Sequence, residues 1–581
     1  MENSGTVSGG DEKSIPRAER VKTWAAWILL SLPLAVHPLF WVRMFRPRVV
    51  AWDCVTLFSL SAMAFVAAAV LMLTGFSDLR RRCAASNLNL LLTLFSAALM
   101  IQSLVRSLCF GRRLEPVEWF LPLLPLAGMA LSRQIMRILP RWGTLVLAVL
   151  IVFTLRFPEY CIGLPGNWNW NLALLTVLIP APFLLRKLNS KRFWIPVLTA
   201  AVFLTAFSLL KPQLTPRGVI VGAIVASAAL WLLWKLPRRQ RLFITILGGA
   251  AGIAMSLSVW MGPADSANRS SRFWLWRGSV ELAMKNGLFG CGAGRFEREI
   301  GPCLPNEYYF SDFATNLHTH PHNELLSAWC DYGLLGVGFV LLLSLAVVSG
   351  LRNYSATRVW GFWLFMVLAL HGQFDVVLQT PLAGTLWLVV GGALAGWRTR
   401  PGGELHPKIG AVGALAAFAM TAVMFMASWY YREALLSYGA GDRYIAGKQL
   451  EKSLALWELP EARYRLGQIE YFDLKSPKQA IGHFKKLSPG YLHSNLYIAL
   501  AYADMGNFKE AAKYLDAESR NFPLSALNAY IKMAVMHESG EDEAALSLQR
   551  ERFYYLLRLR GVSEEELLKD HSLDDRPLRN P

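Results

Sequence analysis

The residues best suited to chemistry gather in one segment, residues 262–324. Three histidines alternate near its end, at His318, His320 and His322. An imidazole that accepts a proton near neutral pH suits a general base. The segment also carries five arginines, whose guanidinium groups bind phosphate oxygens through paired hydrogen bonds; they are Arg269, Arg272, Arg277, Arg295 and Arg298. Together these residue types suit proton transfer and the binding of an anion.

Other interpretations of this segment stay open. The alternating histidines also have the spacing of zinc ligands, although Pro321, between His320 and His322, favours the general base. Cys291 and Cys303 lie in the same segment, where a disulfide could join them. The arginines with the pattern of solvated loop charges are Arg269, Arg295 and Arg298.

A second polar pair interrupts an apolar run further along the chain. His371 and Asp375 are four residues apart, so on a helix they would share one face. An acidic residue inside a membrane segment is costly and is usually functional. The alternative is a polar pair that only packs two helices together.

The composition indicates which elements hold these residues. Of the 581 residues 54% are hydrophobic and 17% are charged, which excludes an ordinary soluble enzyme. The net charge of +18 suggests a nucleic-acid partner at first sight. However, residues 429–581 hold 21 Lys and Arg against 22 Asp and Glu, so the excess lies in the apolar part of the chain. Basic loops between apolar runs are typical of a membrane protein, and no nucleic acid is expected.

Thirteen apolar runs are candidate membrane helices, for which about 20 residues are needed. Lys and Arg favour the loops on the side of the N-terminus, so residues 1–22 are expected to be cytoplasmic. With an odd number of spans, the long loop 262–324 and the chain after residue 429 then lie outside the cytoplasm. The sequence predicts an all-α bundle of about 12–13 transmembrane helices in residues 23–429. The spans are 23–42, 52–75, 88–110, 117–132, 142–156, 172–186, 193–210, 219–235, 242–261, 325–349, 359–379, 381–397 and 409–429.

Residues 430–581 differ in character, with balanced charge and a weak internal repeat. Gly506 and Gly540 are 34 residues apart, and so are Ala511 and Ala545. This spacing is typical of tetratricopeptide units, in which two helices pack through small residues. The sequence predicts a soluble helical repeat domain, more suited to docking a partner protein than to catalysis. A generic bundle of helical hairpins is the alternative.

Several motifs resemble the signature of the O-antigen ligase and polymerase superfamily. They are Arg272 with Trp276, the glycine-rich run 287–296, and Pro321-His322-Asn323 ahead of Gly333-Leu334-Leu335-Gly336. Further similar elements are Leu214 to Gly218, with Pro216 where Ser is usual, Gly166 to Asn171, and His371 with Asp375. The resemblance spans about residues 20–430, and a tetratricopeptide-like tail is a common extension in this superfamily.

The resemblance implies transfer of a glycan from an undecaprenyl-diphosphate carrier to a hydroxyl acceptor at the outer face of the bacterial inner membrane, without a metal or other cofactor. It assigns the diphosphate to Arg217 and Arg272, with Arg277 as a weaker candidate. His322 becomes the general base, and Asn323 orients it or the sugar. The remaining residues expected to contact substrate are His318, His320 and Asp375.

Three acceptors fit the resemblance: a lipid A-core sugar for a ligase, another lipid-linked chain for a polymerase, and a Ser or Thr of a protein for an O-oligosaccharyltransferase. The ligase comes first. A transporter of lipid-linked sugars is the alternative from another class, and it predicts two related halves, which the hydropathy does not show. A noncatalytic scaffold acting through the tail is a third.

Overall fold

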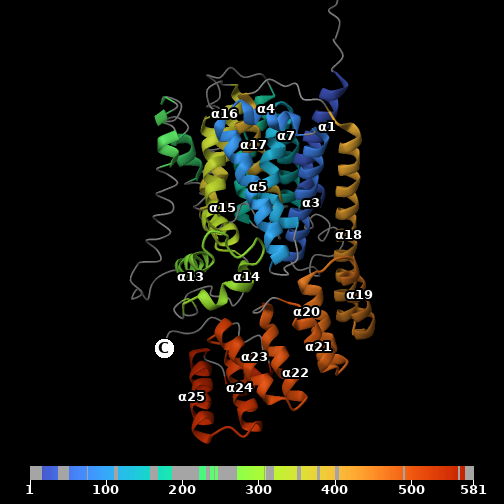
Figure 1. The fold of residues 1–581 in the computed structure, drawn as a ribbon, viewed down its shortest axis with the longest axis vertical. Helices are drawn as coiled ribbons and strands as arrows, with labels where there is room; N and C mark the ends of the chain where they lie inside the picture. Colours follow the sequence, from blue (N-terminus) through green and yellow to red (C-terminus); the bar gives the residue numbers. More distant parts are fainter. Residues whose placement is uncertain are drawn as a thin grey trace, which may run out of the picture.

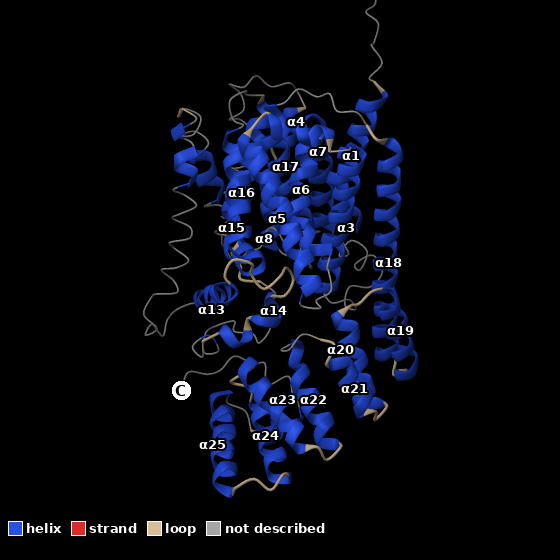
Figure 2. Ribbon diagram, in the orientation of Figure 1, coloured by secondary structure: helices blue, strands red, loops and turns tan. Residues whose placement is uncertain are grey.

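The computed structural model in Figures 1 and 2 describes residues 16–36, 52–74, 76–109, 116–156, 168–185, 222–229, 236–237, 239–240, 242–246, 271–305, 308, 320–349, 355–373, 375, 380–398, 405–487, 491–560 and 563–569. Every regular element among these residues is a helix, and they contain no strand. The predicted all-α membrane bundle is confirmed.

The bundle is built mainly from apolar helices on both sides of residues 262–324 in the sequence. Within the described residues, four helices are long and apolar enough to cross a bilayer, namely α5 (Asn87–Cys109), α7 (Ser132–Arg156), α15 (Glu324–Ser349) and α18 (Pro407–Gly439). Further apolar helices are α3 (Trp52–Thr74), α6 (Phe120–Ala130), α8 (Trp168–Leu178), α16 (Ala356–His371) and α17 (Pro381–Ala395). Alongside them lie α1 (Arg17–Val36), α4 (Ser77–Ala84) and α9 (Ala181–Leu184), which contact α7, α5 and α7 respectively.

Several of the thirteen predicted spans differ from these helices in extent or lie outside the described residues. The runs 193–210, 219–235 and 242–261 lie wholly or largely outside the described residues. The helix in the run 359–379 ends earlier than predicted, because α16 already ends at His371. By contrast α18 continues ten residues beyond the predicted end of the last span, residue 429.

Helices α6 and α17 form the centre of the bundle. Every residue of both helices is buried. Gly128 of α6 lies against the backbone of Val389, and Gly392 of α17 lies against the backbone of Pro125, so close that a methyl group at either glycine would overlap it. Small residues allow membrane helices to pack this tightly.

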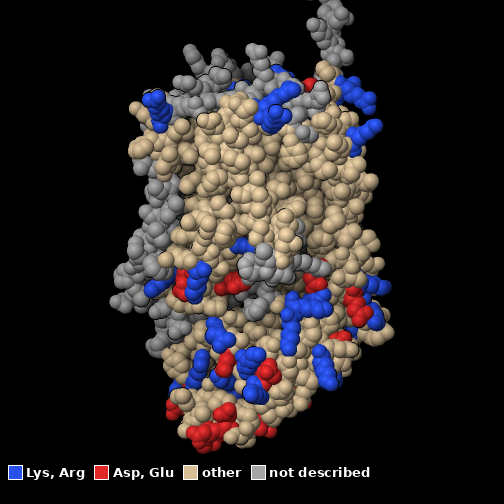
Figure 3. Space-filling model, in the orientation of Figure 1, with Lys and Arg blue, Asp and Glu red and all other residues tan. Residues whose placement is uncertain are grey.

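The outer surface of the bundle is apolar. Helix α5 exposes Leu94, Ile101 and Leu108 along one stripe, and α18 exposes Leu415 and Phe418. Figure 3 shows a wide band of the visible face without Lys, Arg, Asp or Glu, bounded by charged side chains at both ends. Such a band is what a helix bundle presents to lipid.

The two ends of the bundle differ. The start of α1 and the basic helix α4 lie at one end. Helices α13 (Ser271–Asn286) and α14 (Phe296–Glu299) lie at the other end, between the bundle and the tail. The segment that contains the candidate histidine and the tail therefore share one end of the molecule.

Helix α18 connects the bundle to the tail without a break. Its 33 residues span about 50 Å at 1.5 Å per residue, well beyond the roughly 30 Å of a hydrocarbon core. Arg432 lies over the ring of Trp429, 4.9 Å from its centroid. An aromatic and a basic residue together are typical of a membrane boundary. The end of α18 also pairs with the first helix of the tail.

The described part of the tail is a series of helical hairpins. The end of α18 pairs with α19 (Arg443–Leu456), and α20 (Pro460–Gln468) pairs with α21 (Pro477–Phe484). Next come α22 (Ser494–Asp504) with α23 (Phe508–Asn521), and α24 (Ala526–Glu538) with α25 (Glu543–Arg560), before α26 (Glu564–Lys569). Gly506 and Gly540, with φ of 74° and 72°, occupy the same turn of successive hairpins. The relation to tetratricopeptide units stays a prediction.

The far end of the tail packs on the segment that contains α13 and α14. One buried cluster joins Trp274 and Leu275 of α13 and Phe296 of α14 to Phe553 and Leu556 of α25. Gly301 meets Asn521 of α23 so closely that a Cβ at residue 301 would lie 2.6 Å from the Asn521 carbonyl oxygen. The tail therefore shares a hydrophobic core with residues 271–305, which are called the outer segment below.

Candidate active site

The residues before α15 are held by three neighbouring elements. The indole nitrogen of Trp276 on α13 donates to the carbonyl of Pro321 at 2.8 Å. The backbone N–H of Glu324 donates to the carbonyl of Gly372 at 2.7 Å. Asn323 caps α15, since its Oδ1 accepts from Leu326 N at 2.9 Å. Residues 321–324 are thus fixed on α13, on α15 and on the turn after α16.

Asn323 also holds that turn directly. Its Nδ2 donates to the carbonyl of Gln373 at 3.1 Å, and the residue is buried. Both ends of its amide therefore contact the protein. The interaction predicted for Asn323 with the base or the sugar remains untested, and the contacts observed are those of a residue that positions its neighbours.

His322 occupies an unusual backbone conformation between these attachments. Its φ is 52°, in the left-handed region that non-glycine residues seldom adopt and that surrounding contacts must enforce. The His322 side chain is 28% exposed, and its Nδ1 lies 3.4 Å from Oδ1 of Asp375, which is 4% exposed. The ring of His320 lies edge-on to the ring of His322, with the two centroids 4.2 Å apart.

This geometry gives the two nitrogens of His322 different roles. A buried carboxylate that accepts a hydrogen bond from Nδ1–H fixes the tautomer in which Nε2 carries the lone pair. At 3.4 Å the hydrogen bond is at its long limit, which is common in free enzymes before substrate binds. The pair formed by His322 and Asp375 can therefore present one basic nitrogen toward solvent.

Asp375 reaches this position from a turn. The sequence predicts that Asp375 shares one helix face with His371, but α16 ends at His371. Gly372 and Gln373 form the turn that follows, and Asp375 N donates to the His371 carbonyl at 3.1 Å. The end of the helix is what frees Asp375 to face His322, 53 residues earlier in the chain.

Arg272 and Arg277 lie on different faces of α13. Arg272 lies four residues before Trp276 on α13, so both share the helix face that meets Pro321. It is close enough to buried His371 for a direct coulombic interaction. Arg277 is about 140° further round the helix. Its guanidinium lies 5.9 Å from the ring centroid of Trp274.

The other predicted site residues cannot be placed. Arg217 and His318 lie outside the described residues. Among the residues with a part in this site, Trp276 was recognised only as a motif position, and its bond to Pro321 was not foreseen. An aromatic residue one turn after a candidate arginine was the available signal.

The glycine-rich run, residues 287–296, packs closely on α15. Gly287, Gly290, Gly292 and Gly294 all have positive φ, which glycine adopts without strain. Cys291 N donates to the Cys330 carbonyl at 2.6 Å, and the backbone at Gly290 leaves no room for a Cβ against the kink of α15. The run therefore docks α13 and its arginine against α15.

No disulfide joins Cys291 and Cys303, although the sequence allowed one. Both side chains are buried, as is that of Cys330. Burial raises the pKa of the Cys291 thiol well above its ordinary value, and burial is also the main cause of the raised pKa of Cys303. The protonated thiols act as apolar core residues.

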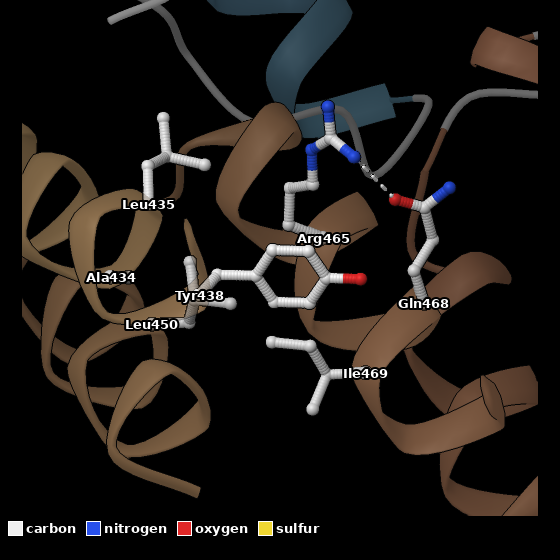
Figure 4. Close-up of a pocket in the computed structure, with 7 residues that line it drawn as sticks. All are labelled: Ala434, Leu435, Tyr438, Leu450, Arg465, Gln468 and Ile469. Carbon is white, nitrogen blue, oxygen red and sulfur yellow. Dashed lines mark hydrogen bonds between the residues drawn. The ribbon is translucent and has the colours of Figure 1, made fainter. Parts of the chain in front are cut away.

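A separate pocket lies within the tail. Figure 4 shows it between α18, α19 and α20, lined mainly by apolar side chains such as Ala434, Leu450 and Ile469. Arg465 donates there to Oε1 of Gln468 at 3.0 Å. The residues that line this pocket include no carboxylate and no histidine.

Comparison with protein families identifies the segment that carries this geometry. Residues 170–341 match the family model of the O-antigen ligase. This part of the chain belongs to the O-antigen ligase superfamily. The match covers α13, the glycine-rich run and His322 of this O-antigen ligase segment, whereas Asp375 and the tail lie beyond it. Neither the curated proteins nor the solved structures gave a match to the chain.

The family and the fold together define the class of protein. It is a multi-pass membrane protein, and the O-antigen ligase family consists of glycosyltransferases of ligase or polymerase type. Such enzymes act on a lipid-linked glycan donor and an acceptor within a membrane.

Proposed function

We propose that the protein transfers a glycan from undecaprenyl diphosphate to a hydroxyl group of lipid A-core, as an O-antigen ligase, on the outer face of the bacterial inner membrane. The observation that carries the proposal is the buried Asp375 carboxylate 3.4 Å from Nδ1 of a His322 side chain that remains partly accessible. A base directed in this way suits the activation of a sugar hydroxyl, which is a weak nucleophile.

In the proposed step, Nε2 of His322 takes the proton of the acceptor hydroxyl while its oxygen attacks the anomeric carbon of the donor. The bond between that carbon and the phosphate oxygen breaks, and the electron pair leaves with the lipid diphosphate. Direct displacement inverts the configuration at the anomeric carbon. Asp375 stabilises the imidazolium that forms, as an acid does when it orients a catalytic histidine.

The leaving diphosphate gains negative charge in the transition state and needs cations near it. Arg272 is the described candidate, because it shares the face of α13 that holds Pro321 and interacts with His371. Arg217 is proposed for the same role from the family motif. Arg277 is the weaker choice, since its guanidinium lies over the ring of Trp274. No metal is proposed for this chemistry.

Transfer by the purified protein tests the proposal and separates the acceptors. The full chain in lipid nanodiscs would receive undecaprenyl-diphosphate-linked glycan together with lipid A-core, a second lipid-linked chain, or a Ser/Thr-rich protein. The ligase predicts a product with lipid A-core alone. A product with lipid-linked chains would indicate a polymerase, and a glycoprotein would indicate an O-oligosaccharyltransferase. Full transfer by folded His322→Ala and Arg217→Ala variants would contradict the proposed mechanism.

A further inference from the structure

The glycine-rich run has a feature that glycan transfer does not use. Leu288 and Phe289 in its first turn are 49% and 52% exposed, and Met284, one helical turn earlier on α13, is exposed as well. Across residues 271–305, 308 and 320–332, these are the only exposed large apolar side chains. Apolar surface confined to one edge of a module marks a contact with another apolar surface.

The turn is fixed between two membrane helices. The carbonyl of Phe289 accepts a hydrogen bond from Gln102 of α5 at 2.5 Å, and Arg106 of α5 donates to the same carbonyl. On the other side Gly333, at the kink of α15, approaches the backbone of Leu288 so closely that a Cβ there would overlap it. The exposed side chains of the turn are therefore held rigidly beside α5.

The surface they join faces lipid. Helix α5 is one of the helices long and apolar enough to cross a bilayer, and it exposes Ile101, Val105 and Leu108 along the part that holds the turn. Leu334, directly after the kink of α15, is exposed too. The apolar edge of the outer segment is thus a continuation of a lipid-facing stripe.

A polar border lies next to this edge. Lys285, beside Met284, forms an ion pair with Glu281 at 2.7 Å, and both side chains are solvent-accessible. The Lys285 ammonium group also lies 3.5 Å from Sγ of Cys303. Long basic side chains beside exposed apolar side chains are typical of the interface between lipid and water. The edge therefore has the arrangement of a segment that enters the bilayer from its surface.

We propose that Met284, Leu288 and Phe289 form a wedge that inserts among the acyl chains of the adjacent membrane leaflet. Bilayer lipid is the occupant because the wedge continues the lipid-facing stripe of α5. The wedge holds the C-terminal end of α13 at a fixed depth. Through that helix it sets the height of Arg272 and Trp276 above the bilayer. The proposal does not depend on the reaction that the protein catalyses.

A fluorine label at position 289 tests the wedge in the full chain. Phe289→trifluoromethylphenylalanine would be prepared in nanodiscs of phosphatidylethanolamine and phosphatidylglycerol. The ¹⁹F relaxation would be measured with dissolved oxygen, which concentrates in the acyl region, and with a water-soluble nickel chelate. Phe418 of α18, 72% exposed on the apolar bundle surface, gives the lipid reference, and Tyr555 of α25, 48% exposed in the tail, gives the water reference.

The wedge predicts that position 289 responds as position 418 does, with several-fold stronger relaxation by oxygen than at position 555 and little effect of the chelate. A response like that of position 555 would show that the turn lies in water and would overturn the proposal. A label shielded from both reagents would overturn it as well, because a second copy of the chain or another protein would then cover the turn. Each result stands whether or not the protein transfers a glycan.

Discussion

At the scale of single residues, one histidine combines the features expected of a general base. His322 lies in a strained backbone conformation and is partly exposed, and a buried carboxylate faces its Nδ1. Strain of this kind persists only where neighbouring contacts enforce it, and here Trp276, Asn323 and Glu324 supply them. The sequence indicated His322 but not its partner, because a contact between residues 53 positions apart leaves no local pattern.

Asp375→Asn should slow transfer without loss of folding. The amide keeps the size of the side chain, but it neither stabilises the imidazolium nor fixes the tautomer of His322 as a carboxylate does. We expect kcat to fall by up to about 10⁴-fold, the cost of this exchange where an aspartate fixes the tautomer of a catalytic histidine. Steady-state transfer by the nanodisc-embedded protein measures it. An unchanged kcat would remove Asp375 from the mechanism.

A second histidine should make the tail sensitive to acid. His483 lies 3.3 Å from Arg463 and can only accept from it, so the folded state favours the neutral ring. Burial and the charge of Arg463 lower the pKa of His483. Because the unfolded chain binds the proton more readily, this contribution to stability is complete above pH ~6.5 and is lost as the pH falls below that value.

The measurement is hydrogen exchange of the α21 peptide in the full chain, corrected for the intrinsic effect of pH. Protection should decrease between about pH 7 and pH 5, by about 1.4 kcal/mol for each unit by which folding lowers the pKa of His483. His483→Asn should reduce that dependence. His537→Asn is the matched control, since the side chain of His537 is 73% exposed in the same tail. Equal pH dependence in both variants would contradict the assignment.

At the scale of elements, turns and kinks place the site more than helices do. The all-α class and most helices follow from composition and apolar length, so the sequence predicted them. The early end of α16 and the kink of α15 at Gly333 were not predicted, because both depend on contacts with distant backbone. Likewise the apolar run predicts that the last span ends at residue 429, yet α18 continues to Gly439. The length of an apolar run does not show how far a helix continues beyond that run.

Gly333→Ala should destabilise the junction of α13 and α15. Gly333 has φ 69° and ψ −158°, a conformation essentially reserved for glycine, and a Cβ would overlap the carbonyl of Leu288. The backbone strain alone costs about 1–3 kcal/mol. Thermal unfolding of the purified protein should show a lowered Tm.

Gly482→Ala in α21 is the matched control. A Cβ there meets no other atom within 4 Å, and alanine favours a helix over glycine by about 1 kcal/mol. If both variants unfolded at the same temperature as the parent, the glycine-rich run would not be the structural junction described.

At the scale of the whole molecule, the tail and the outer segment share a buried cluster. The sequence predicted a separate docking domain, because charge and periodicity change near residue 430. Local signals of this kind cannot indicate the core that α13 and α25 share, because the two helices are far apart in the sequence. The tail therefore contributes to the module that holds Trp274 and, through α13, Arg272.

Phe553→Ala should loosen α13 as well as α25. Phe553 is fully buried in the shared cluster, and removal of a buried phenyl ring typically costs about 3–5 kcal/mol. Hydrogen exchange of the full chain should increase in both helices. Leu548→Ala on the same helix, at a residue 70% exposed, should change neither. Faster exchange confined to the tail would show that the tail is an independent domain.

The rate of glycan transfer by His322→Ala tests the central claim most directly. The variant would be compared with the parent protein and with His537→Ala in nanodiscs, at saturating lipid-linked donor and the acceptor that the parent protein uses. We predict a loss of kcat of about 10²–10⁴-fold, the usual contribution of a general base, and full activity for His537→Ala. Transfer by folded His322→Ala at the parental rate would show that another group accepts the proton, and it would contradict the proposed mechanism.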